Sequence, residues 1–180
     1  MAEGKLTTTA TNLLTMTATT SSVATGTATA GYVSGPIRRT VPASTTNASY
    51  FFPVGQNSAN WFAIYNWSTN AGGPVVVDVS GDNSVGAPNT FDGSLTALTL
   101  GREWTTTIVS GAANMTTYSM QGYDAGMISG NALAGIQSPA TDFSVLGTGS
   151  NFGAAVAPLT QNLTTTLPPL AASTFPDRVS

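Results

Sequence analysis

The sequence predicts an all-β protein, and three features support this prediction. Threonine is abundant, and its stiff, β-branched side chain fits a pleated strand better than a helix. The 19 Gly and 10 Pro residues divide the chain into short pieces with turns between them. Apolar and polar residues alternate with a period of two in several segments, whereas no segment has a convincing helical period.

Residues 1–55 are expected to form a short, threonine-rich strand segment that ends in FPVG. Residues 6–20 alternate throughout, which predicts a strand with one half-buried face and one hydroxylated face. Residues 24–35 repeat the pattern with smaller side chains. Short strands of this kind, separated by glycine, are typical of the flank of a solenoid or the start of a sandwich.

Residues 56–165 are expected to form an antiparallel β-sandwich. Turn signals separate short strands at intervals of about ten residues, which indicates a sandwich or a barrel. Residues 126–137 could hold one helical turn at most, and the Pro-rich stretch 166–180 is expected to be a linker or a terminal arm. The strands are predicted within residues 60–67, 72–83, 94–111, 115–124 and 142–147.

The low content of charge argues against two classes of partner. Charged residues make up 7% of the chain, against roughly a quarter of an ordinary soluble domain, and the net charge is −3. Nucleic-acid binding needs several clustered cations, and the largest basic cluster here is Arg38-Arg39. No apolar run approaches the roughly 20 residues of a membrane-spanning helix. We therefore expect neither nucleic-acid binding nor membrane insertion.

The residue types available also predict a protein that is not an enzyme and has no cofactor. The chain has no His and no Cys, so the usual nucleophile–base pairs and the commonest metal ligands are missing. Acid–base chemistry would need paired carboxylates, and each candidate is expected at a strand end or in a turn, where Asp serves turn geometry. These candidates are Asp78, Asp82, Asp92, Glu103, Asp124 and Asp142.

One calcium site is conceivable among these acidic residues. Asp78, Asp82 and Asn83 could offer carboxylate and carbonyl oxygens to Ca²⁺. Their spacing lacks the periodic Asp, Asn and Gly of a dedicated calcium loop, and an Asx-turn explains them better. We therefore expect no metal at this position.

Aromatic residues and threonines raise two further binding hypotheses. Trp61, Tyr65 and Trp67 share one parity in the predicted strand, and flat rings stack on sugar faces, although part of this cluster is expected to be core. Regular threonine triplets could order water as an ice-binding array, but their unequal offsets favour ordinary β-propensity. The triplets are Thr7-Thr9-Thr11, Thr15-Thr17-Thr19 and Thr25-Thr27-Thr29.

Several short motifs resemble a pattern found in very large secreted surface proteins of Bacteroidetes-type bacteria. There, a Ser/Thr/Gly-rich segment closes on a strand of the form GP(I/V)RR, followed by FPVG and later by R-x-W. Residues 128–147 are also similar to the closing segment of that family. The matching positions here are Tyr32, Val33, Gly35-Pro36-Ile37-Arg38-Arg39, Phe52-Pro53-Val54-Gly55, Arg102 and Trp104.

This resemblance implies an extracellular, modular and non-catalytic protein. Chains with these motifs resemble adhesins and cell-surface filaments exported by the type IX system. We therefore expect a structural or adhesive module of a bacterial cell-surface protein or filament. Its expected partners are neighbouring modules of the same or identical chains, or surface glycans. The alternatives are a carbohydrate-binding module and, behind it, an ice-binding or virion-decoration protein.

The arginines and Trp104 are expected to act as structural clamps where the two segments join. On the strand from 98 to 108, Arg102 shares a face with Trp104, and an inward arginine is destabilising unless it stacks or pairs. Arg102 should therefore lie along Trp104 or an aromatic of residues 60–67. Arg38 and Arg39 point to opposite faces, so one should pack near Phe51-Phe52 while the other stays in solvent.

Overall fold

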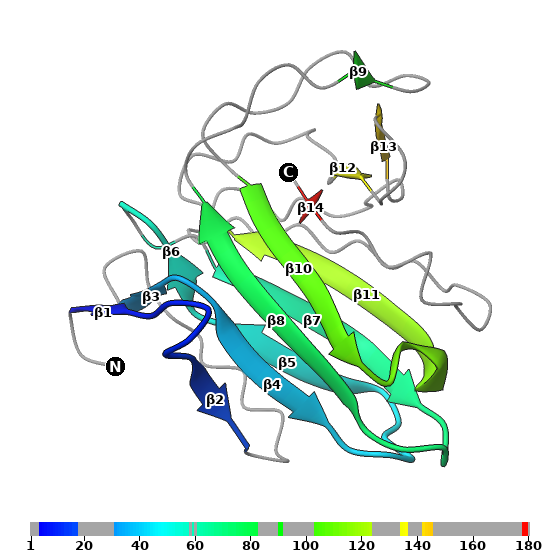
Figure 1. The fold of residues 1–180 in the computed structure, drawn as a ribbon. Coiled ribbons are helices and arrows are strands. Elements are labelled where there is room, and N and C mark those ends of the chain that lie inside the picture. The colour runs from blue at the N-terminus through cyan, green and yellow to red at the C-terminus, as the bar shows by residue number, and fades with distance from the viewer. Residues whose placement is uncertain are drawn as a thin grey trace, which may run out of the picture.

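The protein is all-β over the residues that the structure describes. The computed structural model describes residues 4–17, 31–57, 59, 61–82, 90–91, 103–123, 134–136, 142–145 and 178–179. These residues form strands and one short 3-10 helix, η1 (Ala112–Asn114), and they contain no α-helix (Figure 1). The prediction of an all-β protein is confirmed for this part of the chain.

The strands pair into three sheets. One sheet has the order β2-β4-β8-β10-β14-β12-β13-β9, a second has the order β11-β7-β5, and a small third has the order β1-β3-β6. The strands are β1 (Lys5–Thr7), β2 (Leu14–Met16), β3 (Tyr32–Ser34), β4 (Ile37–Val41), β5 (Ala48–Phe52), β6 (Val54–Gly55), β7 (Trp61–Thr69), β8 (Val75–Asp82), β9 (Thr90–Phe91), β10 (Glu103–Ser110), β11 (Met115–Tyr123), β12 (Ala134–Ile136), β13 (Asp142–Val145) and β14 (Arg178–Val179).

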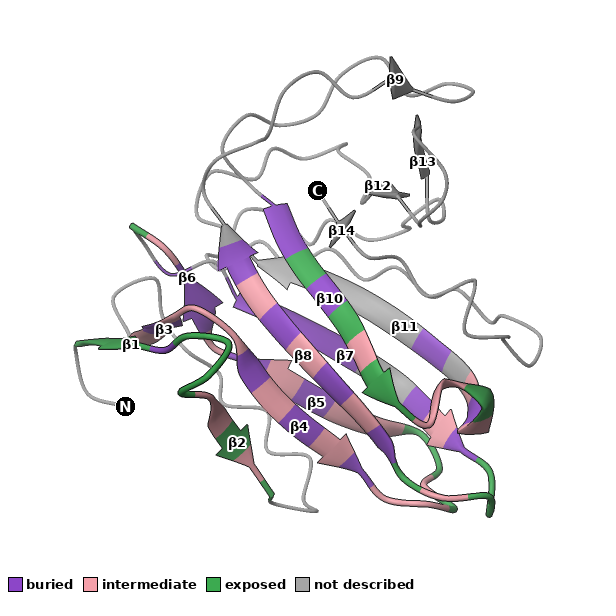
Figure 2. Cartoon of the chain, in the orientation of Figure 1, coloured by how far each residue is buried: buried purple, intermediate pink, exposed green. Residues whose placement is uncertain are grey.

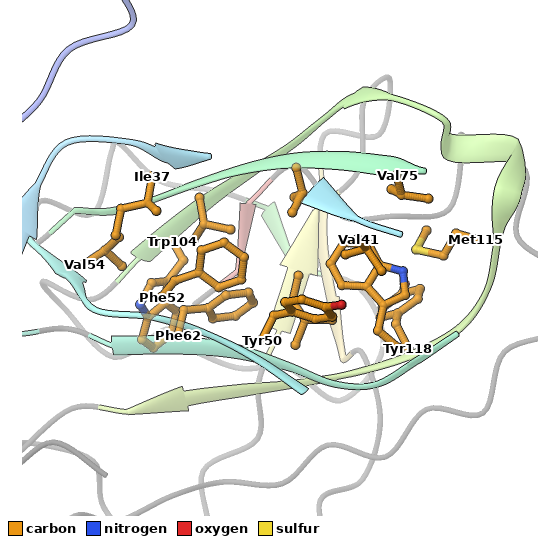
Figure 3. Close-up of a cluster of buried hydrophobic side chains, with 14 of the residues drawn as sticks. Ile37, Val41, Tyr50, Phe52, Val54, Phe62, Val75, Trp104, Met115 and Tyr118 are labelled. Carbon is orange, nitrogen blue, oxygen red and sulfur yellow. The ribbon is translucent and has the colours of Figure 1, made fainter. Parts of the chain in front are cut away.

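The long strands form two antiparallel layers around one core. β4, β8 and β10 pair in the first layer, and β5, β7 and β11 pair in the second. Figure 3 shows side chains from both layers meeting between them. The buried core residues are Val33, Ile37, Val41, Tyr50, Phe52, Val54, Phe62, Ile64, Trp67, Val75, Val77, Val79, Trp104, Met115 and Tyr118.

Period-two alternation decides which side chains of the first layer reach the core. In β8, Val75, Val77 and Val79 are buried, while Asp78 lies on the opposite, partly exposed face. The same alternation produces bands of buried and partly exposed residues along β4, and of buried and exposed residues in the first part of β10 (Figure 2). Each fully buried Val contributes about 1.5–3 kcal/mol relative to an exposed one, so the apolar face of β8 alone is a substantial part of the core.

β7 departs from strict alternation because it contains a β-bulge. Ala48 pairs with Trp67 and Tyr50 pairs with Ile64, so β5 advances by two residues where β7 advances by three. The register between β7 and β11 shifts in the same stretch. An extra residue reverses the parity of everything beyond it. Trp67 therefore joins Ile64 in the core although the two residues have opposite parity.

The N-terminal part forms two short strands instead of the continuous strand expected over residues 6–20. β1 pairs with β3 and β2 pairs with β4, both in parallel. Between them, Thr9 and Asn12 exchange backbone hydrogen bonds with N···O distances of 3.3 and 3.2 Å, and the Asn12 N–H also donates to the Thr9 hydroxyl at 3.1 Å. Such local hydroxyl bonds compete with a strand ladder, so a turn replaces the middle of the predicted strand. Residues 18–20 and 24–30 lie outside the described residues.

The expected boundary at residue 55 does not separate two units in the described residues. β4 pairs with β8 and β5 pairs with β7, so strands from both sides of the boundary share the same layers. The stretch 126–137, where one helical turn was considered, contains the strand β12. The stretch expected to be an arm contains β14, which pairs with β10 and β12; the rest of residues 166–180 lies outside the described part.

Alkaline pH is expected to destabilise the fold through Tyr118. This side chain is buried in β11, and burial raises the pKa of its phenol above the ordinary value of 10.0. The folded state then holds the proton more tightly than the unfolded chain, so the stabilisation is complete below the unfolded pKa and is lost as pH rises above about 10. In urea titrations followed by circular dichroism, we expect the urea concentration at half-unfolding to decrease once the pH exceeds about 10.

Tyr118→Phe should reduce this alkaline loss of stability. Some loss should remain in the variant, because burial also raises the pKa of Tyr50. An unchanged pH profile in Tyr118→Phe would show that the buried phenol is not its source.

Candidate interaction surface

The outward face of the sheet formed by β2, β4, β8 and β10 is the candidate interaction surface. The register places Thr15 opposite Arg38, Arg38 opposite Asp78, and Asp78 opposite Thr107. Four adjacent strands thus contribute one residue each to a line across the sheet, which we call the outer row. Thr15 and Thr107 are exposed, and Arg38 and Asp78 are partly exposed.

An ion pair lies at the centre of the outer row. Nε of Arg38 donates to Oδ1 of Asp78 at 2.7 Å, and Nη2 donates to Oδ2 at 2.8 Å. This two-point geometry matches the planar guanidinium to the carboxylate, and its hydrogen bonds raise the pKa of Arg38. The pair is neutral as a unit. The Arg38 side chain is partly exposed, and its guanidinium is held by Asp78 through two hydrogen bonds.

Hydroxyl groups surround the ion pair on the same face. Ser80 and Thr105 are opposite each other on β8 and β10, and Thr105 is exposed. Thr40 follows on β4 with partial exposure, and Val109 adds one exposed apolar side chain on β10. Figure 2 shows exposed and partly exposed bands across these strands. The surface therefore offers hydrogen-bonding groups, with its central charges neutralised.

Arg39 lies on the opposite face of β4 and connects the two layers. It is only 2% exposed, and its Nη2 donates to the carbonyl oxygen of Phe51 on β5 at 2.8 Å. Its Cζ lies 5.8 Å from the ring centroid of Tyr50 and 5.6 Å from that of Phe52. Burial lowers the pKa of Arg39 because it disfavours the charged form. In the described structure its Nε and Nη1 have no hydrogen-bond partner, so the aromatic rings are its main further contacts.

Trp104 is placed in the core, whereas Arg102 lies outside the described residues. Trp104 on β10 is fully buried, and its ring centroid lies 5.6 Å from that of Phe62 on β7. Trp104 therefore makes a second contact between the two layers, besides that of Arg39. The expected stacking of Arg102 on an aromatic ring stays a prediction.

The tryptophans considered for sugar stacking are buried. Trp61 is 2% exposed and Trp67 is 0% exposed. The Trp61 ring packs edge-on against Phe51 at 5.4 Å, and the Trp67 ring packs edge-on against Tyr50 at 5.9 Å. β7 is the central strand of its sheet, and its bulge turns Trp67 into the core, so neither ring face is open to a ligand. The side chain of Tyr65 lies outside the described residues.

The geometry of β8 argues against the calcium hypothesis. Asp78 lies within the strand and not in the expected turn, and both its carboxylate oxygens accept hydrogen bonds from Arg38. Asp82 is four residues further along the same strand, or roughly 13 Å away, which is too far for two ligands of one ion. Nothing is described of the Asp82 side chain or of Asn83. In the described residues, no group of three His, Cys, Asp or Glu side chains could hold a metal ion.

The first threonine triplet does not form a regular array. Thr7 ends β1, whereas Thr9 and Thr11 belong to the following turn, where their hydroxyl oxygens lie 3.1 Å apart. Their side chains therefore do not repeat at the even spacing of one strand. Of the other triplets, Thr15 is on β2 and Thr17 follows it, and the remaining members lie outside the described residues.

Sequence reasoning missed two contacts that the structure brings together. Asp78 pairs with Arg38 across 40 residues of chain, and the sequence signal for this pair was an acidic residue between valines. Thr8 packs directly over Gly35, and the signal was a glycine before a proline at a strand end.

Comparisons with known proteins found no relative of this chain. No protein-family model, curated protein or solved structure matches the chain. Among the described residues, no helix has the length and apolar character needed to cross a membrane.

Proposed function

We propose that the chain is a non-enzymatic structural or adhesive module of a bacterial cell-surface protein or filament, built as an antiparallel β-sandwich. The observation that carries the proposal is the outward sheet face centred on the outer row. It presents hydroxyl groups and one internally neutralised ion pair. A face of this kind contacts a partner through many weak hydrogen bonds, each worth about 0.5–1.5 kcal/mol, and does not concentrate ions.

The motif residues that resemble the surface-protein family support this role through their positions. In the GPIRR strand, alternation sends Arg38 to the outer row and Arg39 between the layers. In FPVG, Phe52 and Val54 enter the shared core. These residues have structural tasks, as expected of a module whose function is to hold a shape and present a surface. The motifs and the hydroxyl-rich face together support a cell-surface location.

Adhesion of the purified protein tests this proposal. We expect a force-microscope tip coated with the protein to adhere to a lawn of bacterial cells or to a surface coated with the same protein. Thr107→Lys replaces an exposed hydroxyl of the outer row with a long, charged side chain and should weaken adhesion by roughly threefold to tenfold, because hydrogen bonds in the contact are lost. The melting temperature should not change, since Thr107 is exposed.

Ala71→Lys is the matched control, because it adds the same charge at an exposed turn between β7 and β8. This variant should adhere like the parent. Absence of adhesion to both surfaces, or equal losses in Thr107→Lys and Ala71→Lys, would count against the proposed face. Strong binding to one sugar on a glycan array would support the carbohydrate-binding alternative.

A further inference from the structure

Residues 5–16, which we call the N-terminal segment, contribute the edge strands β1 and β2. These strands pair with β3 and β4. β1 is exposed at all three of its residues, and Leu6 is among the exposed apolar side chains. Leu14 and Met16 of β2 are only partly buried where they pack against the core. The segment therefore makes backbone pairings at the edge of the fold and buries little apolar surface.

One residue of this segment, Thr8, occupies a specific site over Gly35, which we call the Thr8 seat. Thr8 is buried; its N–H donates to the carbonyl oxygen of Ser34 at 2.9 Å, and its hydroxyl donates to that of Pro36 at 2.9 Å. Gly35 leaves the space that Thr8 occupies, since a Cβ there would lie 2.3 Å from the Thr8 carbonyl oxygen. Gly35 also has a φ of +119°, which favours glycine. The edge is thus shaped to receive this segment in one register.

The length of sequence between the segment and its edge is compatible with pairing to a second copy. Two parallel strands need a long connection, and the sequence between β2 and β3 includes residues 18–30, which are largely Thr, Ala, Ser and Gly. Any fully extended stretch of this many residues can span at most roughly 45 Å. An identical segment from a second copy would make the same pairings and fill the same seat.

We propose that the N-terminal segment exchanges between copies, so that residues 5–16 of one molecule pair with β3 and β4 of another. The partner is expected to be a second copy of this chain, because residues 5–16 of this chain are the segment that fits the space over Gly35. The choice of a second copy as the partner rests on the proposed function, in which identical modules contact one another. The exchange is separable from adhesion, because a module that keeps its own segment could still adhere through the outer row.

Disulfide trapping tests the exchange. Thr7 and Ser34 are direct partners in the β1–β3 ladder, and the chain has no native cysteine. Neighbouring strands lie about 4.8 Å apart, within the Cα separation that a disulfide accepts. Full-length Thr7→Cys and Ser34→Cys proteins are mixed, incubated at rising concentration and oxidised mildly, and the products are identified by non-reducing mass spectrometry. We expect a disulfide-linked heterodimer of the Thr7→Cys and Ser34→Cys proteins, with a yield that rises with concentration.

Three controls make the result decisive. Thr7→Cys mixed with Thr105→Cys, which is exposed on β10, measures random collision, and the exchange pair should exceed it severalfold. Adding Gly35→Ala to the Ser34→Cys copy blocks the Thr8 seat and should return the yield to that background. The double variant Thr7→Cys/Ser34→Cys, oxidised at low concentration before mixing, should close within one molecule, and this closed protein should then form no dimers.

Two outcomes would overturn the proposal. A mixed yield at the Thr105→Cys background, with normal closure of the double variant, would show that the segment stays in its own copy. Failure of the double variant to close would show that the β1–β3 pairing is not formed. Neither result would alter the adhesion expected of the outer row.

Discussion

Replacing Trp104 with alanine is expected to lower the free energy of unfolding by about 3–5 kcal/mol. Trp104 is fully buried on β10, and its ring packs at 5.6 Å and 34° to Phe62 on β7, in the other layer. Truncation removes apolar contacts from both layers and leaves a cavity that two paired sheets cannot easily close. Urea unfolding followed by far-ultraviolet circular dichroism measures the change without relying on tryptophan fluorescence.

Val109→Ala is the matched control for Trp104→Ala, because Val109 is on the same strand but 45% exposed. Its expected effect is within about 0.5 kcal/mol. Trp104→Phe should fall between Trp104→Ala and the parent, since a smaller ring refills part of the cavity. If Trp104→Ala unfolds at the same urea concentration as the parent, the two layers do not share the core described here.

Arg39→Ala is expected to destabilise the protein by about 2–4 kcal/mol. The guanidinium of Arg39 lies close to the rings of Tyr50 and Phe52 and donates to the carbonyl oxygen of Phe51. Alanine leaves a cavity between β4 and β5 and removes the donor for that carbonyl. The melting temperature and the urea midpoint should both fall.

Arg38→Ala separates this effect from the loss of a positive charge alone. Arg38 is the preceding residue, but it lies on the outward face, where solvent reaches the Arg38–Asp78 pair. The loss of stability in Arg38→Ala should be clearly smaller than that in Arg39→Ala. Arg39→Met should lie closer to the parent, because it fills the space without a desolvated charge. Equal losses in Arg38→Ala and Arg39→Ala would contradict the connecting role of Arg39.

Local patterning was enough to predict the all-β class and the faces of some strands. Alternation in Ile37–Val41 placed Arg38 and Arg39 on opposite faces. The strands β8, β10 and β11 lie within segments predicted to contain strands, and β7 overlaps the segment 60–67 but continues to Thr69. These features depend on neighbours in sequence, so they can be read from short windows.

The remaining features depend on pairing between distant residues or on a single irregular residue. The partner of Arg38 lies 40 residues away, and only the register between β4 and β8 selects Asp78. The bulge in β7 has no glycine to mark it, so simple parity put Trp67 on the wrong face. The turn at Thr9 was hidden because a Thr hydroxyl serves a turn as well as a strand.

The direction of the N-terminal segment also decides how the fold responds to a mechanical load. β1 and β2 run parallel to β3 and β4, so tension between Lys5 and the chain beyond β4 pulls the paired strands past each other along their length. Their hydrogen bonds and the Thr8 seat are then loaded together in shear. An antiparallel hairpin pulled at its two ends would open one bond at a time. Under tension, the segment therefore yields as a unit, and the two layers behind it can stay folded.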